Sequence, residues 1–533
     1  MATFVVAAIN LSVLKANPPL ASQAEPPAPA DSQPPPGRCL CWPRRSPVSS
    51  LRSAPTSLDG YDIVVVGAGN SACAYVSEIL AARPDLRICM IERGSVPNPK
   101  YSDMGSWPND TYDDDQGMIK PLPSSHNVRT ASVVGGGGSV NYTMIHETDA
   151  WLEENLGKPR GFQTWAEAKE HVARWLGVTE SPLREVSPNV RHLFDQLQSW
   201  TLDPPPDAGS VPTLCEDEEP RFRPVHTVFD AKGKRRFNGW NAVDWGRVTL
   251  LERIEVTELV MDASPDGAVC RGLKARDHAT GTRLVRWDLP SNTRVILAAQ
   301  QQSVRLLRSH SHLLPPTVQE HLGKGIQDHI SLPIFVSQAR PAEGRPDPYS
   351  PIFHHSPGDG FLNVYEWTFP EILRSLASWS TAYGTKTGDD AFQYLVPRGS
   401  DRHVFVLCMM IETGEYDKKG VLRFPPLDDS KKASVAKWRE QCKEAETTWW
   451  SRWLLDKLDR FTSNTQFHTC GGCRKGEVVD DSYRVIGTAN LAVIDTSTCP
   501  VPRTSSSMTA YLIGMLAARA HLETWSQDRR SSL

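Results

Sequence analysis

The first clear hydrophobic pattern in the chain is the run at residues 61–66, YDIVVV, where β-branched residues follow one another. A continuous apolar run of this kind predicts a parallel strand that is buried on both faces. A glycine-containing turn and a helical stretch at residues 73–82 follow, and a second apolar run at residues 87–91 ends at Glu92. Strand, turn, helix and strand in this order predict an α/β, Rossmann-type unit.

The turn at residues 67–72 reads GAGNSA, the G-x-G-x-x-A form of the dinucleotide-binding loop. Gly67 permits the tight turn, Gly69 lets the backbone approach a pyrophosphate, and the small Ala72 lets the helix pack on the strand. The helix N-terminus favours phosphates through its N–H groups and dipole. Glu92, twenty residues after Ala72, can accept both ribose hydroxyl protons and repels a 2′-phosphate. The motif alone does not separate FAD from NAD.

Length and composition exclude several classes of protein. A chain of 533 residues predicts two domains with appendages, and its 39% hydrophobic and 23% charged residues are ordinary for a globular protein. A net charge of -4 and the lack of a basic stripe predict no nucleic-acid binding. No apolar run reaches 18 residues, so no membrane span is expected. Eleven scattered cysteines do not form a disulfide framework, which favours reducing surroundings.

Residues 1–57 differ in composition from the rest of the chain. Eleven of the 42 prolines lie there, with Glu25 and Asp31 as the acids and several arginines among serines. Such a stretch buries too little apolar surface to order itself, so a disordered leader is predicted. Its composition is typical of an organellar transit peptide, which suggests a plastid or a mitochondrion. A secretory signal and an untargeted tail, in a cytoplasmic protein, are the alternatives.

Four further segments carry a family resemblance. They are residues 133–141 (VVGGGGSVN), 248–262, 294–299 with 323–329 (RVILAA and GKGIQDH), and 467–476 (FHTCGGCRKG). With the dinucleotide loop, they make the chain similar to the glucose–methanol–choline (GMC) oxidoreductases, a flavoenzyme family. The resemblance runs in patches and is strongest near the two ends. It departs from the family at Gln300, which stands where the family has a glycine-bearing turn.

The resemblance implies FAD as the cofactor, held non-covalently. The glycine-rich loop containing Gly136 and Asn141 corresponds to the family's loop beside the flavin, and its glycines let backbone N–H groups crowd a ligand. Some family members attach FAD through a histidine at the position of Val140, so valine implies a dissociable flavin. Val256 matches a backbone position that holds adenine, and Asp495 matches a position near the ribityl chain and pyrophosphate.

The resemblance also implies a catalytic histidine. His468 matches the family's catalytic position, and histidine suits a base that takes a hydroxyl proton near neutral pH. As imidazolium it can instead stabilise an anion, and an ordinary core histidine is the other alternative. Ser506 aligns with the family's second His or Asn, yet serine cannot act as a base near neutral pH. Cys470 and Cys473 have redox or zinc spacing, but no second pair accompanies them, so no metal is expected.

The expected fold class is α/β (α+β overall), with a Rossmann-like FAD-binding domain and a substrate-binding domain built on an antiparallel sheet. The FAD-binding domain is assigned to residues 58–144, 241–331 and 462–533. The substrate-binding domain is assigned to residues 145–240 and 332–461. Aromatic clusters at residues 365–369 and 449–453 either line a hydrophobic pocket or belong to ordinary core.

The leading hypothesis is oxidation of an alcohol by hydride transfer to flavin N5, with His468 as general base. The expected partners are a small-molecule substrate and O2 or another electron acceptor. Two alternatives use the same fold: a light-driven decarboxylase or lyase, and a flavin-binding protein that has lost catalysis. The transit-like leader and Ser506 favour the first alternative, while Gln300 and Ser506 favour the second.

Overall fold

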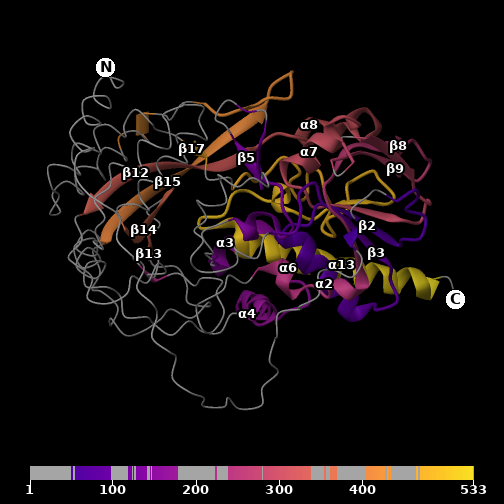
Figure 1. Ribbon diagram of the computed structural model, residues 1–533, viewed down its shortest axis with the longest axis horizontal. Helices are drawn as coiled ribbons and strands as arrows, with labels where there is room; N and C mark the ends of the chain where they lie inside the picture. Colours follow the sequence, from indigo (N-terminus) through magenta and orange to yellow (C-terminus); the bar gives the residue numbers. More distant parts are fainter. Residues whose placement is uncertain are drawn as a thin grey trace, which may run out of the picture.

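The structure is a computed structural model, and it describes chiefly residues 55–97, 118–140, 145–177, 238–337, 402–425 and 468–531 with short gaps, together with short strands elsewhere. The described residues form two parts (Figure 1). One is a layered unit that contains both the early strands and the C-terminal helix. The other is a long antiparallel sheet that extends away from it.

A six-stranded sheet lies at the centre of the layered unit, and each adjacent pair of its strands runs parallel. In spatial order the strands are β1 (Ser50–Leu51), β7 (Val248–Leu251), β3 (Ile88–Ile91), β2 (Ile63–Val66), β11 (Arg294–Leu297) and β18 (Leu491–Val493). β2 therefore has β3 on one side and β11 on the other. The carboxyl ends of parallel strands meet at one edge of the sheet, where ligands of such folds bind.

Both faces of this sheet are covered, which explains the uninterrupted apolar run of β2. Ile63 and Val65 belong to the core on one face, and Val64 and Val66 belong to the core on the other. Because side chains alternate along a strand, a strand between two layers must be apolar at every position. Burying each side chain of this size stabilises the fold by about 1.5–3 kcal/mol.

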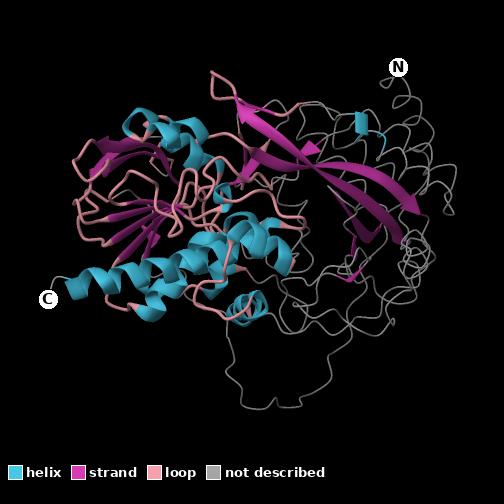
Figure 2. Ribbon diagram, turned by 180° about the vertical axis from the view of Figure 1, so that it is seen from behind, coloured by secondary structure: helices cyan, strands magenta, loops and turns pink. Residues whose placement is uncertain are grey.

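The two covering layers differ (Figure 2). The helices of the first layer are α2 (Asn70–Ala82), α3 (Asp149–Leu156), α4 (Trp165–Leu176), α6 (Gly239–Ala242) and α13 (Ser506–Ser531). The second layer contains an antiparallel sheet of β8 (Ile254–Asp262), β9 (Val269–Asp277) and β10 (Arg283–Asp288), with α7 (Gln301–Arg308) and α8 (Pro316–His321). Among the described residues, no helix combines the length and the apolar character that crossing a bilayer requires.

The second part of the molecule is an antiparallel sheet. Its strands are β17 (Asn464–Thr465), β12 (Ile326–Ser337), β15 (Arg402–Tyr416), β14 (Gly360–Thr368), β13 (Phe353–His355) and β6 (Arg223–Pro224), with β16 (Leu422–Arg423) beside β15. A hairpin of β4 (Ile119–Pro121) and β5 (Arg129–Ala131) and four short 3-10 helices complete the described elements: η3 (Gly136–Ser139), η4 (Trp245–Arg247), η5 (Ser311–Leu313) and η6 (Thr496–Thr498). The predicted fold class, a Rossmann-like unit joined to an antiparallel sheet, is confirmed.

The elements do not follow the predicted domain boundaries everywhere. Part of the predicted disordered leader belongs to the fold, because β1 pairs with β7 and the carbonyl of Pro55 accepts a hydrogen bond from Trp287 Nε1 at 2.8 Å. Helices α3 and α4, assigned to the substrate-binding domain, pack in the core with α2 and α13 through Trp151 and Trp165. Amphipathic helices bury their apolar face against whichever layer is nearest, and sequence position alone does not reveal which.

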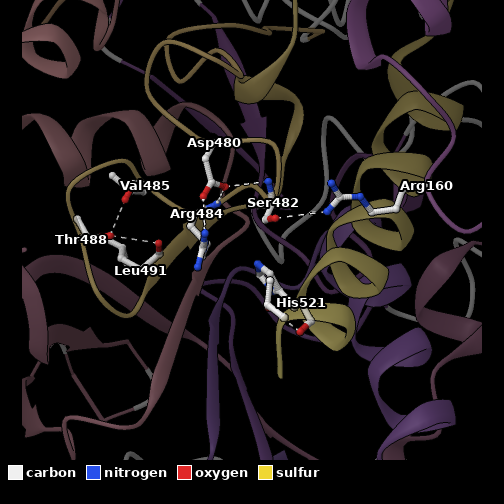
Figure 3. A network of polar contacts seen from close by, with 9 residues as sticks. Arg160, Asp480, Ser482, Arg484, Val485, Thr488, Leu491 and His521 are labelled. Atoms are coloured by element: carbon white, nitrogen blue, oxygen red, sulfur yellow. Dashed lines mark hydrogen bonds and ion pairs between the residues drawn. The ribbon is translucent and has the colours of Figure 1, made fainter. Parts of the chain in front are cut away.

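A turn ahead of β18 is fixed by its own side chains (Figure 3). Asp480 Oδ1 accepts the N–H groups of Ser482 and Arg484 at 2.8 and 3.0 Å. The hydroxyl of Ser482 also accepts a hydrogen bond from Arg160 at 3.3 Å. Below it on α13, His521 Nδ1 lies 2.8 Å from the hydroxyl of Tyr75. The Tyr75 contact ties the C-terminal helix to α2, the helix that follows the dinucleotide loop, and the Arg160 contact ties the turn to the segment between α3 and α4.

Helices α2 and α13 cross at very short range. A Cβ built on Gly514 of α13 would lie 2.1 Å from the carbonyl oxygen of Ser71, on the first turn of α2. No side chain larger than hydrogen fits there, so Gly514 sets how closely the C-terminal helix approaches the dinucleotide loop.

We predict that Gly514→Ala lowers the free energy of unfolding by about 2 kcal/mol, because overpacking outweighs the helix propensity that alanine gains. The midpoint of urea or thermal unfolding measures this change. Gly60→Ala is the matched control, because its added Cβ would meet only Arg87 Nη1 at 3.7 Å. The close-packing account is wrong if Gly514→Ala is as stable as the wild-type protein.

Candidate active site

A large cleft opens at the carboxyl edge of the parallel sheet. It holds about 1500 Å³ of space, part of it open to solvent. Eight of the ten predicted site residues line it: Gly67, Gly69, Glu92, Gly136, Val256, His468, Asp495 and Ser506. Ala72 is buried in α2 behind the lining, and Asn141 lies outside the described residues.

Two glycine-rich loops form one wall of the cleft. Gly67 has a φ of 100°, and a Cβ there would lie 2.5 Å from the carbonyl oxygen of Ala298, directly after the neighbouring strand β11. Gly136 faces Gly69 so closely that its Cβ would lie 2.7 Å from the Cα of Gly69. With no side chains in the way, backbone N–H groups border the cleft directly.

The N-terminus of α2 faces this wall without a partner of its own. Gly69 is its N-cap residue, no side chain caps it, and its first turn contains no acidic residue. Next to it, Asn70 is 8% exposed and its Oδ1 has no hydrogen-bond partner among the described residues. Uncapped N–H groups and an amide that can donate or accept are the donor set that a pyrophosphate and its neighbouring hydroxyls require. The wall therefore fits a dinucleotide.

Glu92 is held at the end of β3 by backbone donors. Its Oε2 accepts the N–H of Ala68 at 3.0 Å, and its Oε1 accepts the N–H of Gly94 at 2.8 Å. Burial raises the pKa of the carboxyl, and these hydrogen bonds oppose the rise. Each carboxylate oxygen keeps a second lone pair. Since Glu92 lines the cleft, those lone pairs are available to ribose hydroxyls, as the sequence motif requires.

Asp495 contributes to the cleft through the loops that it holds in place. Its Oδ2 accepts the N–H of Gln300 at 2.8 Å and the hydroxyl of Ser303 at 2.7 Å, and its Oδ1 accepts the N–H of Ser497 at 2.9 Å. Both oxygens are therefore engaged within the protein. Its side chain fixes the starts of α7 and η6, whose residues border the cleft.

Gln300 takes the conformation that a glycine would adopt. Its φ is 53°, in the left-handed region, where a non-glycine residue costs about 1 kcal/mol or more. Its side-chain Nε2 donates to the carbonyl oxygen of Thr469 at 2.7 Å. The turn at Gln300 is thus linked through its side chain to the loop of His468.

His468 also lines the cleft and is partly buried. Its Nδ1 is 2.8 Å from Nδ1 of His329, and its backbone N–H donates to Asp328 Oδ1 at 3.0 Å. Burial lowers the pKa of His468 to about 4, so its ring is neutral at pH 7. The imidazolium considered from the sequence is therefore not the resting form. Ser506, the first residue of α13, lines the same cleft.

The Cys470 and Cys473 thiols lie in the interior of the protein. Both side chains are fully buried, and burial raises the pKa of each thiol, so the reactive thiolate is disfavoured. Among the described residues, no group of three or more His, Cys, Asp or Glu side chains is placed to hold a metal ion.

Sequence reasoning missed several residues of the site. Asn70 carried a usable signal, because it is the polar residue inside the glycine loop. His329 ends the GKGIQDH segment, and its contact with a histidine 139 positions away left no local signal. The aromatic cluster at residues 449–453 lies outside the described residues, and residues 365–368 lie on β14.

Comparisons with known protein families and solved structures test the resemblance that the motifs indicate. Residues 423–515 match the family model described as GMC oxidoreductase. No curated protein sequence matches the chain significantly.

Several solved structures share its fold, each at 16% sequence identity. A pyridoxine 4-oxidase from Mesorbium loti has a TM-score of 0.58, with 87% of this chain and 99% of that chain covered. A formate oxidase has a TM-score of 0.56, with 88% of this chain and 99% of that chain covered, and a mutant formate oxidase from Aspergillus oryzae, described for its effect on FAD modification, has the same values. A fungal aryl-alcohol oxidase has a TM-score of 0.54 and coverage of 88% and 100%. The chain thus carries the C-terminal segment of the GMC oxidoreductases at residues 423–515 and shares the fold of these oxidases, which confirms the resemblance that its motifs indicate.

Proposed function

We propose that this chain is an FAD-dependent oxidoreductase that oxidises an alcohol, with His468 as the general base. One observation carries the proposal: a single cleft joins the dinucleotide loop, Glu92 and His468, which come from opposite ends of the sequence. The solved neighbours named as oxidases of pyridoxine, formate and aryl alcohols support a small-molecule substrate and an oxidase reaction.

The residues of the cleft fit the cofactor. Gly67, Gly69 and Asn70 would hold its pyrophosphate, and Glu92 its adenosine ribose. The bound flavin supplies the acceptor for the hydride of the substrate. Val140 lines the cleft and has no nucleophilic atom, which supports non-covalent attachment at that position.

His468 takes the hydroxyl proton of the substrate at Nε2, since Nδ1 is turned to His329. A pKa of about 4 keeps this nitrogen available at neutral pH, but such a ring holds a proton weakly. The proton must therefore leave the hydroxyl as the C–H bond breaks rather than before it. Ser506 can donate a hydrogen bond to the same oxygen but cannot remove its proton.

We predict that the purified protein is yellow and that acid precipitation releases all of its FAD into the supernatant. Absorbance of the supernatant and of the redissolved pellet measures the two fractions. Flavin that stays with the pellet would contradict non-covalent binding. A colourless protein that cannot be reconstituted with FAD would contradict the cofactor assignment itself.

A second prediction concerns the base. A substrate is first identified by anaerobic bleaching of the flavin absorbance with primary aliphatic, aryl and pyridine alcohols. With that substrate, His468→Ala should slow flavin reduction about 10²–10⁴-fold and leave FAD bound. Stopped-flow absorbance measures the rate. The exposed His312 provides the control His312→Ala, which should reduce the flavin at the wild-type rate.

The pH dependence of the same rate tests the protonation state. Burial depresses the pKa of His468 below 6.5, so the basic form persists as the pH falls and is lost only near pH 4. The reduction rate should stay level through pH 6 and fall toward pH 4. A midpoint near 6.5 would show a solvated histidine.

Carbon dioxide released under blue light would instead favour the decarboxylase alternative, and no response to any substrate would favour the non-catalytic one.

A further inference from the structure

Two histidines from distant segments meet edge to edge behind the cleft. Nδ1 of His329 lies 2.8 Å from Nδ1 of His468, and the ring centroids are 5.1 Å apart with the planes at 87°. At this distance two lone pairs repel each other and two N–H groups collide. One Nδ1 therefore carries a proton and the other accepts it.

The two rings have little freedom to move apart. His329 is fully buried on β12, and Asp328 Oδ1 accepts the backbone N–H groups of both histidines, at 2.7 Å for His329 and 3.0 Å for His468. Asp328 Oδ2 accepts the hydroxyl of Thr469 at 2.9 Å. The backbones of Gln327 and Cys470 also exchange two hydrogen bonds, at 2.8 and 2.9 Å, which join the same two segments.

The direction of the hydrogen bond decides what His468 presents to the cleft. A neutral imidazole carries one proton, so a proton on Nδ1 leaves Nε2 as a bare acceptor. With the opposite tautomer, Nε2 carries the proton and His468 can donate but cannot take a proton from a hydroxyl. Only the first tautomer can receive a proton at Nε2 without any other proton moving.

We infer that His329 is a positioning residue that accepts the Nδ1 proton of His468 and thereby keeps Nε2 of His468 an acceptor toward the cleft. This inference rests on the proposed function. When the substrate proton reaches Nε2, His468 becomes an imidazolium whose Nδ1–H remains bonded to His329. The Asp328 carboxylate, whose Oδ1 accepts the backbone N–H groups of both residues, holds the two segments in register during this step.

Two substitutions of His329 separate acceptance of the proton from simple packing. In His329→Asn, the amide oxygen can occupy the place of Nδ1 and accept the same proton. In His329→Leu, the side chain fills similar space with no acceptor. The control is His312→Leu, the same change at an exposed histidine.

The first measurement is the 15N spectrum of histidine-labelled protein with FAD bound, in which His468 is identified by its loss in His468→Ala. In the wild type and in His329→Asn, the His468 Nε2 resonance should lie in the range of an unprotonated imidazole nitrogen. In His329→Leu, the protonated Nε2 form should appear. A protonated Nε2 in the wild type overturns the inference without reference to any substrate.

The second measurement compares kcat and KM of the His329 variants with those of the wild type, for the substrate identified above. We expect His329→Leu to lower kcat about 10²-fold with KM nearly unchanged, as when an orienting partner of a base is removed. His329→Asn should keep most of kcat. Equal losses in both variants with an unchanged His468 spectrum would mean that His329 only packs, and the inference would be wrong.

The two proposals fail in different ways. If no substrate reduces the flavin, the proposed function fails while the nitrogen spectrum still reports the tautomer. If His468→Ala loses activity but His329→Leu changes neither the spectrum nor kcat, the proposed function stands and the role of His329 is refuted. Should His329→Leu not fold, the wild-type and His329→Asn spectra still decide.

Discussion

The site depends on buried carboxylates that accept backbone N–H groups. Glu92, Asp328 and Asp495 each lie at the cleft or directly behind it, and each accepts hydrogen bonds from residues of a different loop. A buried charge without donors would cost several kcal/mol, whereas one that accepts several hydrogen bonds satisfies loops that would otherwise leave N–H groups unpaired. The walls of the cleft are therefore fixed before any ligand arrives.

This arrangement explains why the site draws on the whole length of the chain. Glu92 follows β3, Asp328 lies on β12, and Asp495 follows β18, so each carboxylate joins a segment to another that is distant in sequence. The glycine-rich wall also depends on a contact between distant segments, because Gly136 can approach Gly69 this closely only if Gly136 has no side chain. Precise placement here comes from tertiary contacts, and a local motif supplies only the residue types.

That division also marks what the sequence could predict. Gly67, Gly69 and Glu92 were identifiable because strand, turn, helix and acid are neighbours in sequence and their roles follow from backbone geometry. The left-handed backbone of Gln300 could not be identified in this way. Glutamine is unfavourable in that conformation unless tertiary hydrogen bonds, here to Asp495 and Thr469, stabilise it. The contact between His329 and His468 depends on the pairing of β12 with a late loop, and the core position of α3 and α4 depends on packing. Periodicity predicts none of these.

The described lining of the cleft bears on the kind of substrate. Its one lysine or arginine is Arg93, which lies beside Glu92 and Glu255 and donates to the carbonyl oxygen of Ala131 at 2.8 Å. The lining residues next to Ser506 are Ser505 and Ser507, and Gln300 is bonded to the neighbour of His468; none of these three side chains carries a charge. Burying a carboxylate substrate there would require a cation that these residues do not supply. An uncharged hydroxyl needs only an acceptor and a donor, and a neutral imidazole beside a serine provides both. These two described side chains thus support the proposed oxidation of an alcohol, whose hydroxyl group needs one acceptor and one donor.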